Sequence, residues 1–371
     1  MSQTYTKYTT YTRKPYLCHC ILNMKNSLLI SALFIFAFLF SSCISNSQQD
    51  TGSSCEYARY FDIIEHETSK AIVVISPYDN VHDTLYINKP IERIICMSSS
   101  QVAGMAEIGA DSTISAVSGL RYITNPNLHS RAVADVGYEA SLDYEKILSL
   151  NPDVLLTYTV SGAEPSYIPR LRSLGVRVLV LNDHLENHPL ARAEYIRLYG
   201  ALTGREEFAD SLFSSICDRY DSLTVASDEP RLKVLMNVPY GDAWYIPGGD
   251  SYMARLLNDA GGEVIGSEPG VVASRVIRME EAYALSQDAD IWLNPGPCRT
   301  LDELVSFHHA FRYFGPVANG RPIYNNTLRM TPEGGNDFWE SGSVRPDLVL
   351  EDLTHIIADL DGELKYHFKV K

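Results

Sequence analysis

A pattern of helix, turn and buried strand occurs twice in this chain, and this repetition restricts the folds that the chain can adopt. Three segments of the first half are echoed in the same order in the second half: residues 89–97 by 229–237, residues 145–156 by 280–293, and residues 175–179 by 320–324. Each match alone is weak, because helix, glycine and strand recur in any α/β protein. Their common order predicts two related α/β lobes.

A single helix is expected between the two halves. Residues 205–223 carry Phe208, Leu212, Ile216, Tyr220 and Leu223 at helical spacing, with acidic residues in the first turn. At 1.5 Å per residue this helix would be about 28 Å long, which is enough to run from lobe to lobe. A helical connection resists bending, so we expect little closure around a ligand. An ordinary packing helix within one domain would show the same apolar stripe.

Two short strand-like segments, residues 71–75 and 84–87, flank a turn-rich stretch and predict an N-terminal β-hairpin. The predicted organisation has five parts: a signal peptide with lipobox at 1–43, a flexible tether at 44–56, an N-terminal α/β lobe with the hairpin at 57–200, the connecting helix at 205–224, and a C-terminal α/β lobe at 229–371.

The N-terminal region reads as a secretion leader. Residues 28–40 form an apolar run of 13 residues, which is too short for a spanning helix and is typical of a signal-peptide core. The run ends in two serines and Cys43, which resembles a bacterial lipobox, so we expect Cys43 to carry the lipid. A noncleaved single anchor is the alternative. Because a complete charged-then-apolar signal begins at Met24, translation is expected to start there. A start at Met1 is the alternative.

Charge and motifs exclude several classes of function. The chain has 31 Lys and Arg against 46 Asp and Glu, a net charge of -15, which argues against nucleic-acid binding. Cys55, Cys96, Cys217 and Cys298 are dispersed and lack the paired spacing of a zinc site. The chain has no GxGxxG, GxxxxGK[ST] or GxSxG motif.

Open α/β sheets bind ligands beyond the carboxyl ends of their strands. In this sequence the residues that follow strand-like segments are Ser98 and Ser99, Tyr158, and the stretch that contains Tyr240, Trp244 and Tyr245. Tyr122 follows a further strand-like segment. We therefore expect these residues to face a cleft between the lobes.

Five segments together resemble the periplasmic substrate-binding proteins of ABC importers for iron-siderophore, haem and cobalamin complexes. They are residues 90–119, 136–156, 171–181, 199–212 and 345–353, and the resemblance extends from about Pro90 to Leu360. It implies two Rossmann-like lobes joined by one long helix, with a metal chelate held between them.

The resemblance also implies roles for individual residues. Tyr138 lies where cobalamin-binding relatives place an aromatic residue of the cleft, and residues 336–345 are similar to their cleft segment, which makes Phe338, Trp339 and Arg345 candidates. Aromatic faces suit a macrocycle or catecholate, and an arginine can pair with carboxylate or phosphate. In that family one surface glutamate on each lobe docks into arginine pockets of the permease. In this sequence Glu145 resembles the first of these glutamates, and either Glu280 or Glu281 resembles the second.

We therefore expect a lipid-anchored, monomeric binding protein on the periplasmic side of a membrane, which delivers a metal chelate to an ABC permease and its ATPase. It would have no enzymatic activity, no cofactor and no metal site of its own. The alternatives are a protein that binds bare zinc or manganese, with His129, His184 or His188 as partial ligands, and a membrane-tethered hydrolase. The sequence does not choose among cobalamin, haem and a ferric siderophore.

Overall fold

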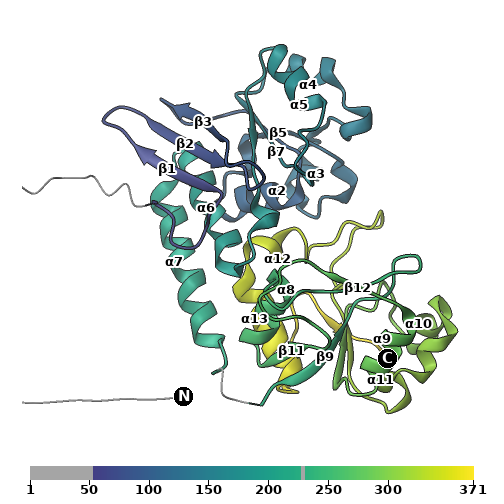
Figure 1. Ribbon diagram of the computed structural model, residues 1–371. Coiled ribbons are helices and arrows are strands. Elements are labelled where there is room, and N and C mark those ends of the chain that lie inside the picture. Colours follow the sequence, from purple (N-terminus) through teal and green to yellow (C-terminus); the bar gives the residue numbers. More distant parts are fainter. Residues whose placement is uncertain (1–52, 227–229) are drawn as a thin grey trace, which may run out of the picture. The chain divides into compact units, whose positions relative to one another are not determined.

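The computed structural model describes residues 53–226 and 230–371 (Figure 1). The expected signal peptide, with Met24 and the lipobox residue Cys43, lies outside the described residues. Residues 44–52 of the expected tether lie outside them as well. Within the described ranges, none of the helices combines the length and the apolar character that crossing a bilayer requires.

The first half of the chain builds a parallel sheet with strand order β6-β5-β4-β7-β8. Its strands are β4 (Ile94–Cys96), β5 (Ile114–Val117), β6 (Ala134–Asp135), β7 (Val154–Thr157) and β8 (Val178–Val180). Its helices are α2 (Ser99–Glu107), α3 (Pro126–Ser130), α4 (Tyr144–Leu150), α5 (Tyr167–Ser173) and α6 (Pro189–Thr203). Every residue of β4 and β7 is buried, as expected for strands covered by helices on both faces. We call residues 94–203 the N-lobe.

The second half builds a sheet with strand order β11-β9-β13-β14-β15, in which only β15 is antiparallel to its neighbour. Its strands are β9 (Leu232–Met236), β11 (Gly262–Val264), β13 (Ile291–Leu293), β14 (Ile323–Asn325) and β15 (Phe368–Lys369), and β10 (Trp244–Ile246) pairs with β12 (Arg275–Ile277) in a separate ribbon. Its helices are α8 (Tyr252–Asp259), α9 (Met279–Ser286), α10 (Leu301–Phe307), α11 (Gly315–Ala318), α12 (Ser341–Val344) and α13 (Pro346–Ile357). We call residues 232–369 the C-lobe.

The two sheet orders place the echoed sequence segments at corresponding positions. In the N-lobe, β4 is followed toward one edge by β7 and β8. In the C-lobe, β9 is followed by β13 and β14. These strands belong to the three pairs of segments that match in the sequence. The α/β fold class predicted from the echo is therefore correct.

Helix α7 (Glu206–Leu223) lies between the two halves of the sequence and packs against α6 of the N-lobe and α13 of the C-lobe (Figure 1). Its buried face is formed by Ala209, Phe213, Ile216 and Tyr220. Phe208, which the sequence placed on the apolar stripe, is 55% exposed instead. The close approach of α6 explains this rotation, because a Cβ added to Gly200 would lie 2.6 Å from the Ala209 side chain.

The hydrophobic core is continuous across both lobes. One cluster of buried side chains includes Ile94 from the N-lobe sheet, Tyr195 and Tyr199 from α6, and Val234 from the C-lobe sheet. Residues Ser53 to Lys371 accordingly form one compact unit. Separating the lobes widely would expose this apolar surface to water, so large hinge motion is disfavoured.

The N-terminal element is a three-stranded antiparallel sheet, with order β1-β2-β3. The expected hairpin is present as β2 (Lys70–Ile75) and β3 (His82–Ile87). The sequence analysis missed β1 (Phe61–Glu65), which pairs with β2 along its whole length. Because this strand has charged residues and only three apolar ones, it lacks a clear alternation.

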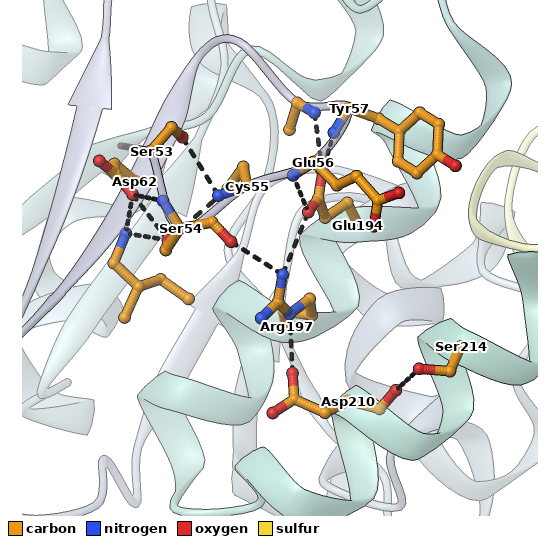
Figure 2. Close-up of polar contacts among 12 residues, drawn as sticks. Ser53, Ser54, Cys55, Glu56, Tyr57, Asp62, Glu194, Arg197, Asp210 and Ser214 are labelled. Atoms are coloured by element: carbon orange, nitrogen blue, oxygen red, sulfur yellow. Dashed lines mark hydrogen bonds and ion pairs between the residues drawn. The ribbon is translucent and has the colours of Figure 1, made fainter. Parts of the chain in front are cut away.

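Buried carboxylates hold the start of the described chain against α6 (Figure 2). Glu194 is fully buried, and its two oxygens accept the backbone N–H groups of Glu56, Tyr57 and Ala58 at 2.7, 2.8 and 2.7 Å. Arg197 donates to Glu194 and to the carbonyl oxygen of Ser54 at 3.2 and 3.0 Å. The expected flexible tether therefore does not extend to residue 56, because residues 54–56 are bound to the body.

Glu194→Ala should lower the free energy of unfolding by about 3 to 5 kcal/mol, because it strands three backbone donors in a buried position. Urea unfolding measures this change. Glu207→Ala, which removes an exposed carboxylate from α7, is the control and should change stability by less than about 0.5 kcal/mol. Equal effects of the two substitutions would contradict the assigned role of Glu194.

Candidate functional site

The N-lobe wall of the candidate site is formed by Arg121, Tyr122 and Tyr138. The Tyr122 and Tyr138 ring centroids are 6.2 Å apart, and the Arg121 guanidinium lies 4.8 Å from the centroid of the Tyr122 ring. Tyr122 and Tyr138 are 37% and 41% exposed. A Cβ added to Gly119 would lie 2.3 Å from the Tyr138 hydroxyl oxygen, so a glycine at this left-handed position lets Tyr138 lie over the backbone.

Asp135 holds this wall together at the carboxyl ends of β5 and β6. One carboxylate oxygen accepts the N–H groups of Gly119 and Gly137 at 3.0 and 2.9 Å, and the other accepts that of Leu120 at 2.9 Å. Burial raises the pKa of the Tyr138 hydroxyl, and the interaction with that hydroxyl raises the pKa of Arg121. At neutral pH the wall therefore presents a neutral phenol beside a charged guanidinium.

A pocket of about 510 Å³ opens between this wall and the C-lobe. It is lined by Leu120, Arg121, His129 and Asp135 of the N-lobe and by Thr331, Pro332 and Glu333 of the C-lobe. Its volume is in the range of small-molecule sites. The predicted cleft residues Tyr122, Tyr138 and Trp339 do not line this pocket themselves, but each lies within a few residues of its lining in the sequence.

The C-lobe side of the site carries Trp339, which is 48% exposed. The neighbouring residue Phe338 is only 2% exposed and packs against Tyr366 and His367, with ring centroids 6.0 and 5.4 Å away. The expectation that Phe338 lines the cleft is therefore wrong. The Phe338 and Trp339 rings pack edge to face with centroids 4.7 Å apart, and Trp339 is the accessible one of the pair.

Trp244 is also a core residue and not a cleft residue. It is fully buried, stacks on Phe314 with centroids 5.8 Å apart, and donates its indole N–H to the Met236 carbonyl oxygen at 2.9 Å. Strand alternation explains the difference, because Trp244 faces inward while Tyr245 faces outward opposite Val276. Tyr245 is 43% exposed and Tyr240 is 85% exposed.

Arg345 does not offer a free positive charge to a ligand. It forms a bidentate ion pair with Asp347, at 3.0 and 2.7 Å, and donates to Glu107 of α2 at 3.0 Å. The prediction that it binds the ligand is therefore wrong, and the cation that borders the pocket is Arg121. Sequence reasoning missed Arg121, although it directly precedes Tyr122 after a strand end.

Ser98, Ser99 and Tyr158, the remaining N-lobe cleft candidates, do not line this pocket. Ser98 is the N-cap residue of α2, and its side chain forms a capping box with Gln101. Ser99 is the first residue of the helix. Tyr158 is 38% exposed and lies edge-on to His184, 5.7 Å between centroids. The loop after Tyr158 borders a separate pocket of about 450 Å³ under the β2–β3 turn.

The two glutamates expected to dock to a permease occupy equivalent helix positions. Glu145 is the second residue of α4 and Glu280 is the second residue of α9, and both are exposed (Figure 1). Glu281 is bound to Arg275 at 2.6 Å. Among the described residues, neither Glu145 nor Glu280 has an ion-pair partner. This difference favours Glu280 over Glu281 as the C-lobe docking residue.

The histidines considered as metal ligands have other contacts. The His129 ring lies 2.7 Å from the Ile123 carbonyl oxygen, and His188 accepts the Leu190 N–H at the start of α6. In residues 53–226 and 230–371, no group of three or more His, Cys, Asp or Glu residues could hold a metal ion.

Comparison with known protein families identifies the chain. Residues 94–306 match the model of the periplasmic binding protein family. The chain belongs to this family. The match begins at β4 and ends within α10, so it includes the N-lobe sheet, the connecting helix and strands β9, β11 and β13 of the C-lobe sheet.

Individual relatives agree with this assignment. This binding protein is 27% identical over 300 residues to an uncharacterized lipoprotein of Methanocaldococcus jannaschii, covering 77% of this chain and 70% of the relative. It is 24% identical over 194 residues to the iron(3+)-hydroxamate-binding protein FhuD of Bacillus subtilis, covering 52% of this chain and 53% of that protein. The haem-binding protein HutB of Vibrio cholerae has a similar fold, with a TM-score of 0.55, 21% identity, and coverage of 70% of this chain and 98% of HutB.

Proposed function

We propose that the protein is the substrate-binding component of an ABC importer and captures a metal chelate between its lobes. The observation that carries the proposal is the interlobe pocket, which is lined by the Arg121 guanidinium on one lobe and by residues 331–333 on the other. Two exposed tyrosines, Tyr122 and Tyr138, pack beside Arg121, and residues 331–333 lead to the exposed Trp339. Aromatic faces bind flat, partly apolar groups at low entropic cost, and arginine binds carboxylate or phosphate. A ferric siderophore, haem and cobalamin all combine these features in part. The relatives that bind ferric hydroxamate and haem support the same class.

The paired glutamates support delivery to a permease. Glu145 lies in the first turn of α4 on one lobe, and Glu280 lies in the first turn of α9 on the other. Together they would bind the two halves of a symmetric permease. Basic pockets on the permease would complement them. The ATPase of the importer would supply the energy, and this chain would hydrolyse nothing.

A lipid on Cys43 would keep the protein at the cell envelope, on the periplasmic side of a membrane. The leader-like sequence and the lipoprotein relative support this anchor. Cys43→Ala should abolish incorporation of labelled fatty acid, measured in cells that express the full chain. Undiminished labelling of this variant would refute the anchor at Cys43.

Absorbance spectra test the ligand class. The protein is incubated with hemin, with ferrichrome or with cyanocobalamin, passed through a desalting column, and its spectrum is recorded. One chelate should remain bound in a one-to-one ratio, and its spectrum should be unchanged after hours because nothing is consumed. Retention of none of the three, or conversion of one of them, would contradict the proposal.

A further inference from the structure

A buried carboxylate joins the lobes beside the candidate site, in addition to α7 and the continuous core. Glu340 of the C-lobe is only 3% exposed, and its carboxylate reaches the N-lobe. One oxygen accepts the Thr124 N–H at 2.6 Å and the other accepts the Asn125 N–H at 3.1 Å. These donors follow the turn that carries Arg121 and Tyr122. Burial raises the pKa of the Glu340 carboxyl to about 7, so above that pH the acceptor is charged and its hydrogen bonds are stronger than neutral ones.

Further contacts reinforce the same seam. Asp337 accepts the Thr124 hydroxyl at 3.0 Å, and its other oxygen pairs with Arg329 at 2.7 Å. A Cβ added to Gly335 would lie only 2.0 Å from the Tyr122 carbonyl oxygen. The C-lobe segment thus lies directly on the backbone of Tyr122, and only a glycine allows this approach.

The contact has an aromatic side chain of the site on each side. Tyr122 lies two residues before Thr124, and Trp339 directly precedes Glu340. Any shift in the Glu340 contact therefore moves the two walls relative to each other. The Arg345–Glu107 ion pair fixes the other end of the segment to α2, which leaves the seam little freedom.

We infer that Glu340 is a positioning residue that sets the width of the ligand cleft by tying the Trp339 side of the site to the Tyr122 side. This inference rests on the proposed function for its consequence in binding. The tie itself is a property of the protein without ligand. It explains how a cleft between two lobes can be held ready for a rigid chelate without a closing movement.

The first test uses the ligand-free full chain. Amide hydrogen exchange is measured at Thr124 and Asn125 in Glu340→Ala, Glu340→Gln and Thr124→Val, and small-angle scattering gives the radius of gyration. Exchange in Glu340→Ala should rise at least about 10-fold at these two amides with no change at Leu235 and Met236 of β9, and the radius should increase. Glu340→Gln should restore part of the protection, because its amide oxygen still accepts one N–H.

Glu263→Gln is the control, because it removes an exposed carboxylate from β11 of the same lobe, away from the pocket lining, and it should change neither readout. Unchanged exchange in Glu340→Ala, or increased exchange with an unchanged radius, would overturn the inference. If Glu340→Ala does not fold, Glu340→Gln takes its place, and a rise of less than about twofold at Thr124 and Asn125 would overturn the inference. Thr124→Val removes only the hydroxyl contact with Asp337 and should leave exchange at Asn125 unchanged.

The second test concerns binding. Dissociation of hemin, ferrichrome and cyanocobalamin is followed by stopped-flow absorbance. For the chelate that binds, Glu340→Ala should accelerate both association and dissociation, whereas a purely structural role would lower only the fraction of active protein. If none of the three binds, the proposed function fails, while the exchange and scattering results still decide whether Glu340 ties the lobes together.

Discussion

Cells in which Glu145 and Glu280 are both replaced by alanine should lose uptake of the chelate by more than about 100-fold, while the purified variant binds the chelate with unchanged affinity. Removing one buried charge of an interface pair typically costs 2 to 5 kcal/mol, and here two would be lost together. Neither glutamate contacts the candidate site, so binding has no reason to change. Both are exposed in the first turn of a helix, so the fold should also tolerate the change.

Radiolabelled uptake in cells and titration of the purified protein measure the two halves of this prediction. Glu281→Ala is the matched control, because Glu281 follows Glu280 in the same turn but is bound to Arg275. It should leave uptake near the wild-type rate. Equal loss with Glu281→Ala, or normal uptake in the double variant, would remove the docking assignment without affecting the ligand site.

Trp339→Ala should weaken chelate binding by roughly 10- to 100-fold, with little change in the unfolding midpoint. The side chain is 48% exposed, so little of its area stabilises the folded state, whereas a bound chelate would cover it. Phe307→Ala is a suitable control, because Phe307 is similarly exposed, at 51%, but lies on α10, outside the segment that runs from the pocket-lining residues 331–333 to Trp339.

Arg121→Gln separates the candidate chelates further. The substitution should weaken hemin, which carries two carboxylates, more than a neutral ferric hydroxamate, and the loss should shrink at high salt. Isothermal titration at two salt concentrations measures both effects. Unchanged affinity for every chelate in both Trp339→Ala and Arg121→Gln would show that the ligand is held elsewhere.

The general fold could be predicted because the signals that specify it are local and repeated. Short apolar runs recur in the same order in both halves of the sequence, and they become β4, β7 and β8 in one lobe and β9, β13 and β14 in the other. The strand β1 was missed because it is stabilised by pairing with β2, and the sequence of a short charged segment does not indicate such pairing.

Individual site residues were harder to predict, because side-chain direction depends on packing partners distant in the sequence. Trp244 and Phe338 resemble binding aromatics, yet each has a buried cluster that receives it. Arg345 was predicted to bind the ligand, but the fold places the carboxylates of Glu107 and Asp347 within hydrogen-bond distance of its guanidinium. Glu340 had no sequence signal, since its partners are backbone N–H groups that any residues could supply.

Hydrogen exchange of the protein with and without the chelate that it retains tests the central claim most directly, which is that the ligand lies between the lobes. The account predicts added protection in residues 119–138 of the N-lobe and in residues 331–340 of the C-lobe at the same chelate concentration. Protection confined to residues 74–83 and 159–164, around the pocket under the β2–β3 turn, or to one lobe alone, would contradict it.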